Sequence, residues 1–337
     1  MKLEQYNSLS EKASIFGNKY KRIDSCEAFD KWFSGNHGKY FRGINEARFK
    51  NYTSAQRLYM THELHIHNIH IADLVKKQVE SLKKARNGLI CTYFKSLLGY
   101  EPSDLLLLSF AQHQKNGIAP LLDFSFDRRI ALFFMADGCD FSKCGSNRDS
   151  INSSVSIEDY ASLYYLTGRN KLTLEKVIDA ELHTQFQKLR TKYADKLNTI
   201  PSNGNNTSIS RFINYQLKLQ ERHLKEKFIK GLLSTSIKDL ILESSSDDNS
   251  LLPQIMIANL NITAQQGCFI YHNDNLKPFE DLYCVDIHKS LIPYIRNHYI
   301  MLNSSKANGL SSCWIYPDPS AIVEESINDA LSEIVKH

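Results

Sequence analysis

Apolar positions in this chain follow a helical spacing over long stretches that are otherwise rich in lysine, glutamate and asparagine. Between residues 54 and 95 apolar side chains recur every three to four positions, namely Ile71, Leu74, Val75, Val79 and Leu82. This spacing places them on one face of an amphipathic helix. Related patterns predict further helices over residues 26–33, 104–112, 127–136, 172–197, 209–230 and 322–335.

Short runs of aromatic and β-branched residues predict strands between these helices. They lie at residues 40–42, in a segment ending at Asp123, and at 162–166, 255–260, 268–271 and 283–287. Segments rich in glycine, serine, asparagine and aspartate at 138–157, 201–206 and 244–250 predict loops. Because the strands come from distant points of the chain with helices inserted between them, the pattern predicts an α+β fold.

Composition fits this picture of a folded globular protein. The chain has 337 residues, of which 42% are hydrophobic and 11% aromatic, which is enough for a packed core. The first fourteen residues are polar and charged, and no stretch approaches the roughly 18 apolar residues of a membrane helix. We therefore expect a cytoplasmic protein that has no membrane partner.

The seven cysteines are scattered and include no C-x-x-C pair, which argues against a disulfide framework or a zinc ribbon. We expect reduced thiols and no bound metal. Four histidines, His62, His65, His67 and His70, cluster in a predicted helix, where pairs three residues apart would share a face. A polar helix face is the alternative to metal binding, because the zinc-protease H-E-x-x-H spacing is absent.

Positive charge is concentrated in one part of the sequence. The net charge of the chain is only +4, but residues 169–230 contain thirteen lysines and arginines and six acidic residues. A basic region of this kind can contact the phosphates of a nucleic acid, independently of base sequence. The alternative is a solvated helical face.

The sequence Tyr40-Phe41-Arg42-Gly43 places an arginine on a predicted strand beside a glycine. The planar guanidinium can bind a phosphate or carboxylate through two hydrogen bonds, and the glycine allows a turn or the close approach of a ligand. The alternative role for Arg42 is a structural salt bridge, for which Asp123 is a candidate partner.

Polar residues also close the apolar strand at 121–125. Asp123 and Ser125 are candidates either for facing a ligand or for capping the helix that follows. Gln265 and Gln266 precede Gly267 at the start of another predicted strand, and their amides can orient a hydroxyl group or satisfy buried backbone.

Taken in order, these segments resemble the FRG-domain family, which is named for its Phe/Tyr-Arg-Gly triplet. The resemblance rests on residues 40–43, His113, 121–125 continuing into 130–136, 264–269 and 315–318. Many members have Thr-Arg before the Leu-Leu-Asp run, where this chain has Ala119 and Pro120. The resemblance implies one domain over residues 1–337, with a split mixed or antiparallel sheet similar to that of ADP-ribosyltransferases. Helical insertions are expected at about 54–100 and 170–245.

The function implied by this resemblance is NAD-dependent ADP-ribosyl transfer by a toxin or antiviral defence effector. NAD is then a substrate, residues 169–230 are expected to present an RNA acceptor, and an inhibitor or antitoxin protein is the expected partner. The alternative is a non-catalytic module that senses a nucleotide or phosphate. The implied catalytic residues are Arg42, Asp123, Gln265 and Gln266, with Glu280 as another possible carboxylate, and the implied NAD-binding residues are Phe41, Arg42, Gly43, His113, Ser125 and Tyr164. An amide pair in the third motif departs from the transferases that carry a glutamate there.

Overall fold

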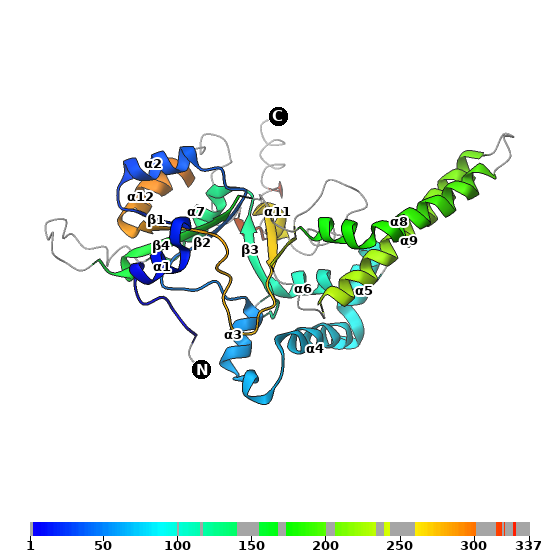
Figure 1. The fold of residues 1–337 in the computed structure, drawn as a ribbon, viewed down its shortest axis with the longest axis horizontal. Coiled ribbons are helices and arrows are strands. Elements are labelled where there is room, and N and C mark those ends of the chain that lie inside the picture. Colours follow the sequence, from blue (N-terminus) through cyan, green and yellow to red (C-terminus); the bar gives the residue numbers. More distant parts are fainter. Residues whose placement is uncertain are drawn as a thin grey trace.

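The computed structural model describes residues 3–99, 101–114, 117–139, 155–167, 173–199, 206–233, 239–242, 260–300, 315–318, 320 and 326–327. Its fold is α+β, as the sequence pattern predicts (Figure 1). The strands are β1 (Tyr20–Ile23), β2 (Tyr40–Ile44), β3 (Leu121–Ser125), β4 (Tyr160–Leu166), β5 (Leu240–Leu242), β6 (Gly267–Tyr271) and β7 (Tyr283–His288). The helices that matter for the site are α1 (Leu9–Phe16), α2 (Cys26–Gly35), α3 (Ser54–Thr61), α6 (Asp104–Gln112), α7 (Arg128–Ala136), α11 (Leu260–Ala264) and α12 (Ile292–Ile295).

These strands form one sheet in the order β1-β7-β4-β2-β3-β6-β5. Only β1 and β7 run parallel, and the other neighbours are antiparallel, so the sheet is mixed. Strands β2 and β4 pair over the whole of β2, from Tyr40 to Ile44, and β3 pairs with β6 from Leu121 to Ser125. By contrast, β2 and β3 are in register at one position, Phe41 with Ser125. The sheet therefore divides into two halves that diverge from this point.

The buried side chains form three groups, of which only the third contains residues from both halves of the sheet. On one face of β1, β7, β4 and β2, apolar side chains pack against α2, α7 and α12. On one face of β3, β6 and β5, another set packs against the helical layer that includes α3 and α6. A third cluster contains Phe16 of α1 together with side chains from both halves, such as Tyr164 and Phe124. The divergence of β2 and β3 thus leaves a continuous core on one side only.

The first predicted helical insertion contains α3, α4 (Ile71–Lys84) and α5 (Leu89–Leu98). The second contains α8 (Leu174–Asn198) and α9 (Asn206–Leu233), which pack side by side and project away from the sheet (Figure 1). The same predicted range also contains β5, which pairs with β6 as an edge strand of the sheet. Sequence patterns missed β5, β1 and α1, because segments of three to eight residues are too short for periodicity to identify.

Two predictions are changed by the structure, and others fall outside the described residues. The histidine cluster does not lie on one α-helix, since α3 ends at Thr61 and α4 begins at Ile71; His65 and His67 lie in a short 3-10 helix (Leu64–His67), with Glu63 and Asn68 in left-handed conformations on either side of it. Leu260, predicted as the end of a strand, begins α11. Residues 255–259, most of the loops at 138–157 and 201–206, the loop at 244–250 and most of the tail helix at 322–335 lie outside the described residues.

Candidate functional site

A cleft of about 500 Å³ lies where β2 and β3 diverge. Its walls come from segments far apart in the sequence: the end of β2 and the loop after it, α3, the end of α6, β3, the end of α7, the turn before β6 and the segment at 315–318. Seven of the residues implied by the resemblance line it: Phe41, Arg42, Gly43, His113, Asp123, Ser125 and Gln265. Folding thus brings segments of all the quoted motifs to one place.

Arg42 crosses the opening between the two halves of the sheet. Its Nη1 donates a hydrogen bond to the backbone oxygen of Asp123 at 2.8 Å and lies 4.0 Å from Asp123 Oδ2. The side chain of Arg42 is 15% exposed. Burial lowers the pKa of the guanidinium from its ordinary value, an effect that Asp123 opposes and Arg57 reinforces. An arginine remains protonated even so, which makes Arg42 a fixed positive charge at the base of the cleft.

Asp123 is held in place from the other side by α6. Gln112 Nε2 donates to Asp123 Oδ2 at 3.0 Å, and Ser54 at the start of α3 donates to Gln112 Oε1 at 3.1 Å. The chain of contacts connects α3, α6 and β3, so the carboxylate has a fixed orientation. Asp123 thus pairs with Arg42, as considered for that arginine, and lines the cleft, but it does not cap α7, whose N-cap is Asp127.

Three buried polar atoms at this end of the cleft have no hydrogen-bond partner among the described residues. They are Arg42 Nε, Asp123 Oδ1 and His113 Nε2. Unpartnered buried polar atoms are uncommon and costly in folded proteins, by about 1–3 kcal/mol each. A group of donors and acceptors concentrated in one cleft is the pattern expected where a polar ligand is bound.

His113 caps the C-terminus of α6, with its ring 5.7 Å from that of Phe269 between ring centroids. Burial lowers the pKa of its imidazole from the ordinary value, and Asp123 acts in the opposite direction. The neutral form is therefore favoured near neutral pH. In that form one ring nitrogen is a donor and the other an acceptor, so His113 can hydrogen-bond to a ligand without adding charge.

Part of the cleft wall is aromatic. Phe134 of α7 and Tyr316 meet edge to face, with ring centroids 6.0 Å apart, and Phe41 and Phe49 also line the wall. Tyr316 is 44% exposed, so part of its ring is available to a ligand. Aromatic side chains of this kind can stack against a planar ring such as a nucleobase or nicotinamide.

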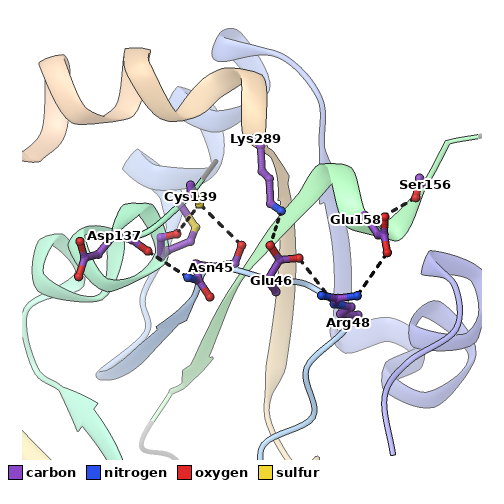
Figure 2. Close-up of polar contacts among 9 residues, drawn as sticks. Asn45, Glu46, Arg48, Asp137, Cys139, Ser156, Glu158 and Lys289 are labelled. Atoms are coloured by element: carbon purple, nitrogen blue, oxygen red, sulfur yellow. Dashed lines mark hydrogen bonds and ion pairs between the residues drawn. The ribbon is translucent and has the colours of Figure 1, made fainter. Parts of the chain in front are cut away.

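Side-chain contacts hold the segment after β2 against the end of α7, Lys289 and Glu158 (Figure 2). Asn45 Nδ2 donates to the backbone oxygen of Asp137 at 3.1 Å, which joins this segment to the end of α7. Next along the chain, Glu46 accepts from Lys289 Nζ at 2.9 Å, and Arg48 bridges to Glu158 at 3.3 Å. Asn45 and Asp137 both line the cleft, so these ties fix two of its polar walls.

Gly43 has a packing role that the sequence did not indicate. A Cβ atom at this position would lie 1.9 Å from the backbone oxygen of Ala131 and 2.6 Å from the nitrogen of Met135. The close approach permitted by the glycine is therefore that of α7. This contact places Phe134 and Asp137 beside the end of β2.

Ser125 and Gln265 line the cleft but are largely used by the protein itself. Ser125 Oγ donates to the backbone oxygen of Gln265 at 2.7 Å and accepts from the nitrogen of Asp127, the N-cap of α7. Gln265 Nε2 donates to the backbone oxygen of Ile315 at 3.1 Å, which fixes the segment that carries Tyr316. Ser125 therefore does not cap α7, whose N-cap is Asp127, but binds the backbone of that N-cap residue, while Gln265 satisfies buried backbone.

Two implied site residues lie elsewhere. Gln266 is exposed, adopts a positive φ of 44°, and borders a separate groove with Arg128 and Asn36. Tyr164 is fully buried in the core beside Phe16 of α1. Tyr164 lies directly opposite Arg42 in the β2–β4 ladder, but its ring does not line the cleft. Glu280 likewise lies outside the lining and accepts a hydrogen bond from Tyr6.

Arg57 is the functional candidate that sequence reasoning missed. It lies on α3, lines the cleft and is exposed, and its guanidinium makes no ion pair or hydrogen bond within the described part of the chain. Its charge lowers the pKa of Arg42. The only available signal was an arginine early in a helix whose N-terminal side is rich in polar residues. The cleft lining thus carries two arginines, both attracted to Asp123, and two aspartates, Asp123 and Asp137.

Within the described residues, no three histidine, cysteine, aspartate or glutamate side chains are grouped as metal ligands, and no disulfide is formed by Cys26, Cys91, Cys139, Cys268 or Cys284. None of the helices that the structure describes is both long and apolar enough to cross a membrane. No family model, curated protein or solved structure matches this chain. Its function must therefore be argued from the cleft.

Proposed function

We propose that the chain is an NAD-dependent ADP-ribosyltransferase, acting as a toxin or defence effector, and that the cleft between β2 and β3 binds NAD. The observation that carries this proposal is the group of unpartnered buried atoms on Arg42, Asp123 and His113 at one end of the cleft. The family resemblance suggests the ligand class, and the cleft has the size and mixed polarity of a nucleotide site.

The charges and rings of the cleft fit the parts of a dinucleotide. Arg42 and Arg57 provide two guanidinium groups for the negatively charged diphosphate. Phe134 and Tyr316 provide ring surface for a planar heterocycle. A diphosphate between the arginines also gives Arg42 Nε an acceptor, which the protein does not provide among its described residues.

In the proposed reaction, the bond between the nicotinamide nitrogen and ribose C1′ breaks, and nicotinamide leaves as a neutral molecule with the electron pair. The acceptor atom forms a bond to C1′ and gives up its proton. Asp123 is the carboxylate placed to stabilise positive charge on the ribose and to accept that proton. Gln265, implied as catalytic by the resemblance, acts in this scheme by positioning Tyr316 through Ile315.

The acceptor proposed for this reaction is RNA, because residues 169–230 carry an excess of positive charge. An inhibitor or antitoxin protein is the proposed partner, since a toxin of this class must be restrained in its own cell. Activity of this kind also places the proposed site of action in the cytoplasm.

A non-catalytic nucleotide-sensing module is the second candidate, and one observation favours it. The third motif supplies amides where many transferases supply a glutamate, and the amide of Gln265 is already hydrogen-bonded to Ile315. Such a module would bind the nucleotide through Arg42 and leave it intact.

The test is to incubate labelled NAD with the protein and separate pools of RNA, DNA and protein, and to measure nicotinamide release. We expect label on RNA, lost in Arg42→Ala and retained in Arg22→Ala, which removes another strand-borne arginine beside a carboxylate, Asp24. Binding of ADP-ribose without nicotinamide release would support the sensing module. Absence of both binding and release would overturn the NAD proposal.

A further inference from the structure

The two long helices of the projecting hairpin differ in how their apolar residues are arranged. On α8 the buried residues form one stripe, and the side chains between them are mainly polar: the stripe consists of Leu174, Ile178, Leu182, Phe186 and Tyr193. This stripe packs into the protein core. Helix α8 is therefore an ordinary amphipathic helix with one apolar face.

Helix α9 has two apolar faces. Leu224 and Phe228 pack against the core, and Ile213 and Leu217 are half-buried at spacings of four and seven residues on the same side. A second set is exposed: Phe212 (61%), Tyr215 (61%) and Leu219 (42%). At about 100° per residue, this set lies on nearly the opposite side of the helix from the packed set, whereas the exposed Ile209 (47%) lies one turn before Ile213 on the packed side.

Exposed side chains of this size are common singly, but three adjacent ones on one face are less so. Phe212, Tyr215 and Leu219 follow the spacing of three and four residues that places side chains next to one another along a helix. They occupy the half of α9 that is far from the sheet, on the hairpin that projects from the protein (Figure 1). They form a continuous apolar surface, which we name the α9 stripe (residues 212, 215 and 219).

Positive charge surrounds the α9 stripe. The described outer parts of α8 and α9, residues 185–199 and 206–220, contain six lysines or arginines and one acidic residue, Asp195. These parts carry a net charge of +5 in a chain whose total is +4, so the rest of the chain is close to neutral. Arg211 and Lys218, on α9 itself, are both exposed. A complementary partner must combine apolar side chains with carboxylates.

We propose that the α9 stripe is the docking surface for an acidic protein partner, which lays the apolar face of a helix along it and directs carboxylates to Arg211 and Lys218. Apolar burial on the stripe provides affinity, and the basic border gives orientation and a fast, salt-dependent association. The proposal holds whether or not the cleft consumes NAD, because no stripe residue lines the cleft.

Features of the surface favour a protein over the other possible occupants. Leu219, one of the three side chains, is aliphatic and offers nothing for a nucleic-acid base to stack on, although Phe212 and Tyr215 could stack. A second copy of the chain would bring two positively charged hairpins together, which is unfavourable. An acidic helix satisfies both the apolar and the charged parts of the surface.

The experiment uses the full chain and two synthetic helical peptides with the same leucine stripe, one bordered by glutamate and the other by lysine. Binding is measured by fluorescence anisotropy at two salt concentrations. We expect the glutamate peptide to bind, more weakly at higher salt, and the lysine peptide not to bind. Phe212→Gln with Tyr215→Gln should weaken binding at least about tenfold, and Arg211→Glu with Lys218→Glu should reverse the peptide preference.

The matched control is Leu89→Gln with Tyr93→Gln, which removes two exposed apolar side chains from α5 (54% and 56% exposed) and should leave binding unchanged. Circular dichroism establishes that each variant remains folded. Equal binding of both peptides, or equal loss in the α5 control, would overturn the proposal. So would binding of a single-stranded RNA oligonucleotide or anionic vesicles through the stripe without binding of the glutamate peptide, or stripe-dependent dimerisation in analytical ultracentrifugation.

Discussion

The sheet carries two pairs of a cation and a carboxylate that differ in almost every property. Lys12 and Asp286 are both completely buried, 2.6 Å apart, and Lys12 Nζ also donates to Ser162 Oγ and the backbone oxygen of Ala47. Tyr20 donates to the second oxygen of Asp286 at 3.0 Å. Arg42 and Asp123 are 4.0 Å apart, are both partly exposed, and each keep a buried polar atom without a partner among the described residues.

This difference separates a structural pair from a candidate binding pair. The hydrogen-bonding capacity of Lys12 and Asp286 is used within the protein, where it ties α1 to β4 and β7. Gln112 and the divergence of β2 and β3 also fix the positions of Arg42 and Asp123. Each of these two side chains nevertheless keeps a polar atom that makes no hydrogen bond with the described residues. A charge that is fixed by its surroundings and still available is what a binding site requires.

The largest effect is expected from breaking the buried pair of Lys12 and Asp286. Lys12→Ala leaves Asp286 as an unpaired buried charge and should lower the free energy of unfolding by about 3–5 kcal/mol. ADP-ribose binding per folded molecule should stay the same. Urea denaturation gives the stability, and calorimetry of the folded fraction gives the binding.

The control for this variant is Lys19→Ala, which removes an ion pair with Asp281 in which both side chains are well exposed. Such a pair contributes at most about 1 kcal/mol. Equal losses of stability in the two lysine variants would show that the buried Lys12–Asp286 pair stabilises the fold no more than an exposed pair does. The assignment of Lys12 and Asp286 as a structural pair would then be wrong.

The next effect concerns the backbone that carries Arg42. Gly43→Ala forces β2 away from α7, because the added Cβ meets backbone atoms that cannot move independently. We expect a loss of about 1–3 kcal/mol in the free energy of unfolding, together with weaker ADP-ribose binding, because Phe134 and Asp137 move with α7. Gly35→Ala, at the end of α2 with no atom within 4 Å of the new Cβ, should change neither measurement. Unchanged binding in Gly43→Ala would mean that α7 does not set the geometry of the cleft.

Sequence patterns predicted much of this fold for a physical reason. Residues 40–42, 121–123 and 283–287 alternate or cluster apolar side chains as buried strands do, and each lies in a strand of the sheet. Helices α2, α6, α7, α8 and α9 were also expected near their observed bounds. The α+β class followed from local patterns alone, because burial of one face imposes them.

The candidate site was less accessible, because its geometry depends on contacts between distant segments. Arg42 was singled out from its strand and neighbouring glycine, but the close approach of α7 at Gly43 is not revealed by any local pattern. Arg57 and Tyr316 reach the cleft only because α3 and the segment at 315–318 fold over it. No local pattern singled out the buried Lys12, since its partner Asp286 lies far from it along the chain.

A smaller effect should separate the two arginines of the cleft. Arg57→Ala removes an exposed charge and should weaken ADP-ribose binding by about threefold to tenfold, less than the loss from Arg42→Ala, because exposed charges are screened by solvent. Stability should hold or rise slightly, since the charge of Arg57 opposes that of Arg42. Arg22→Ala on β1 is the control for binding. Unaltered affinity in Arg57→Ala would assign the diphosphate to Arg42 alone.

The smallest effect is the pH dependence contributed by His113. Burial lowers the pKa of this imidazole below its ordinary value of 6.5, so the unfolded chain binds a proton that the folded protein does not bind between those two values. Stability should therefore rise with pH through that window, by at most about 1.4 kcal/mol per pH unit from this one group. His113→Asn should remove that part of the slope, measured by urea denaturation from pH 5 to pH 7.5.

A titration of His113 also tests whether Asp123, the partner of Arg42, acts on its imidazole. The negative charge of Asp123 raises the pKa of the imidazole and partly offsets burial, so Asp123→Asn should lower that pKa further, as followed by NMR of the His113 ring protons. The equivalent change in the buried pair, Asp286→Asn, should leave the pKa of His113 unchanged, because Asp286 is not among the groups that shift that pKa. An unchanged His113 pKa in Asp123→Asn would mean that the carboxylate is screened from the imidazole and that the two groups do not belong to one electrostatic site.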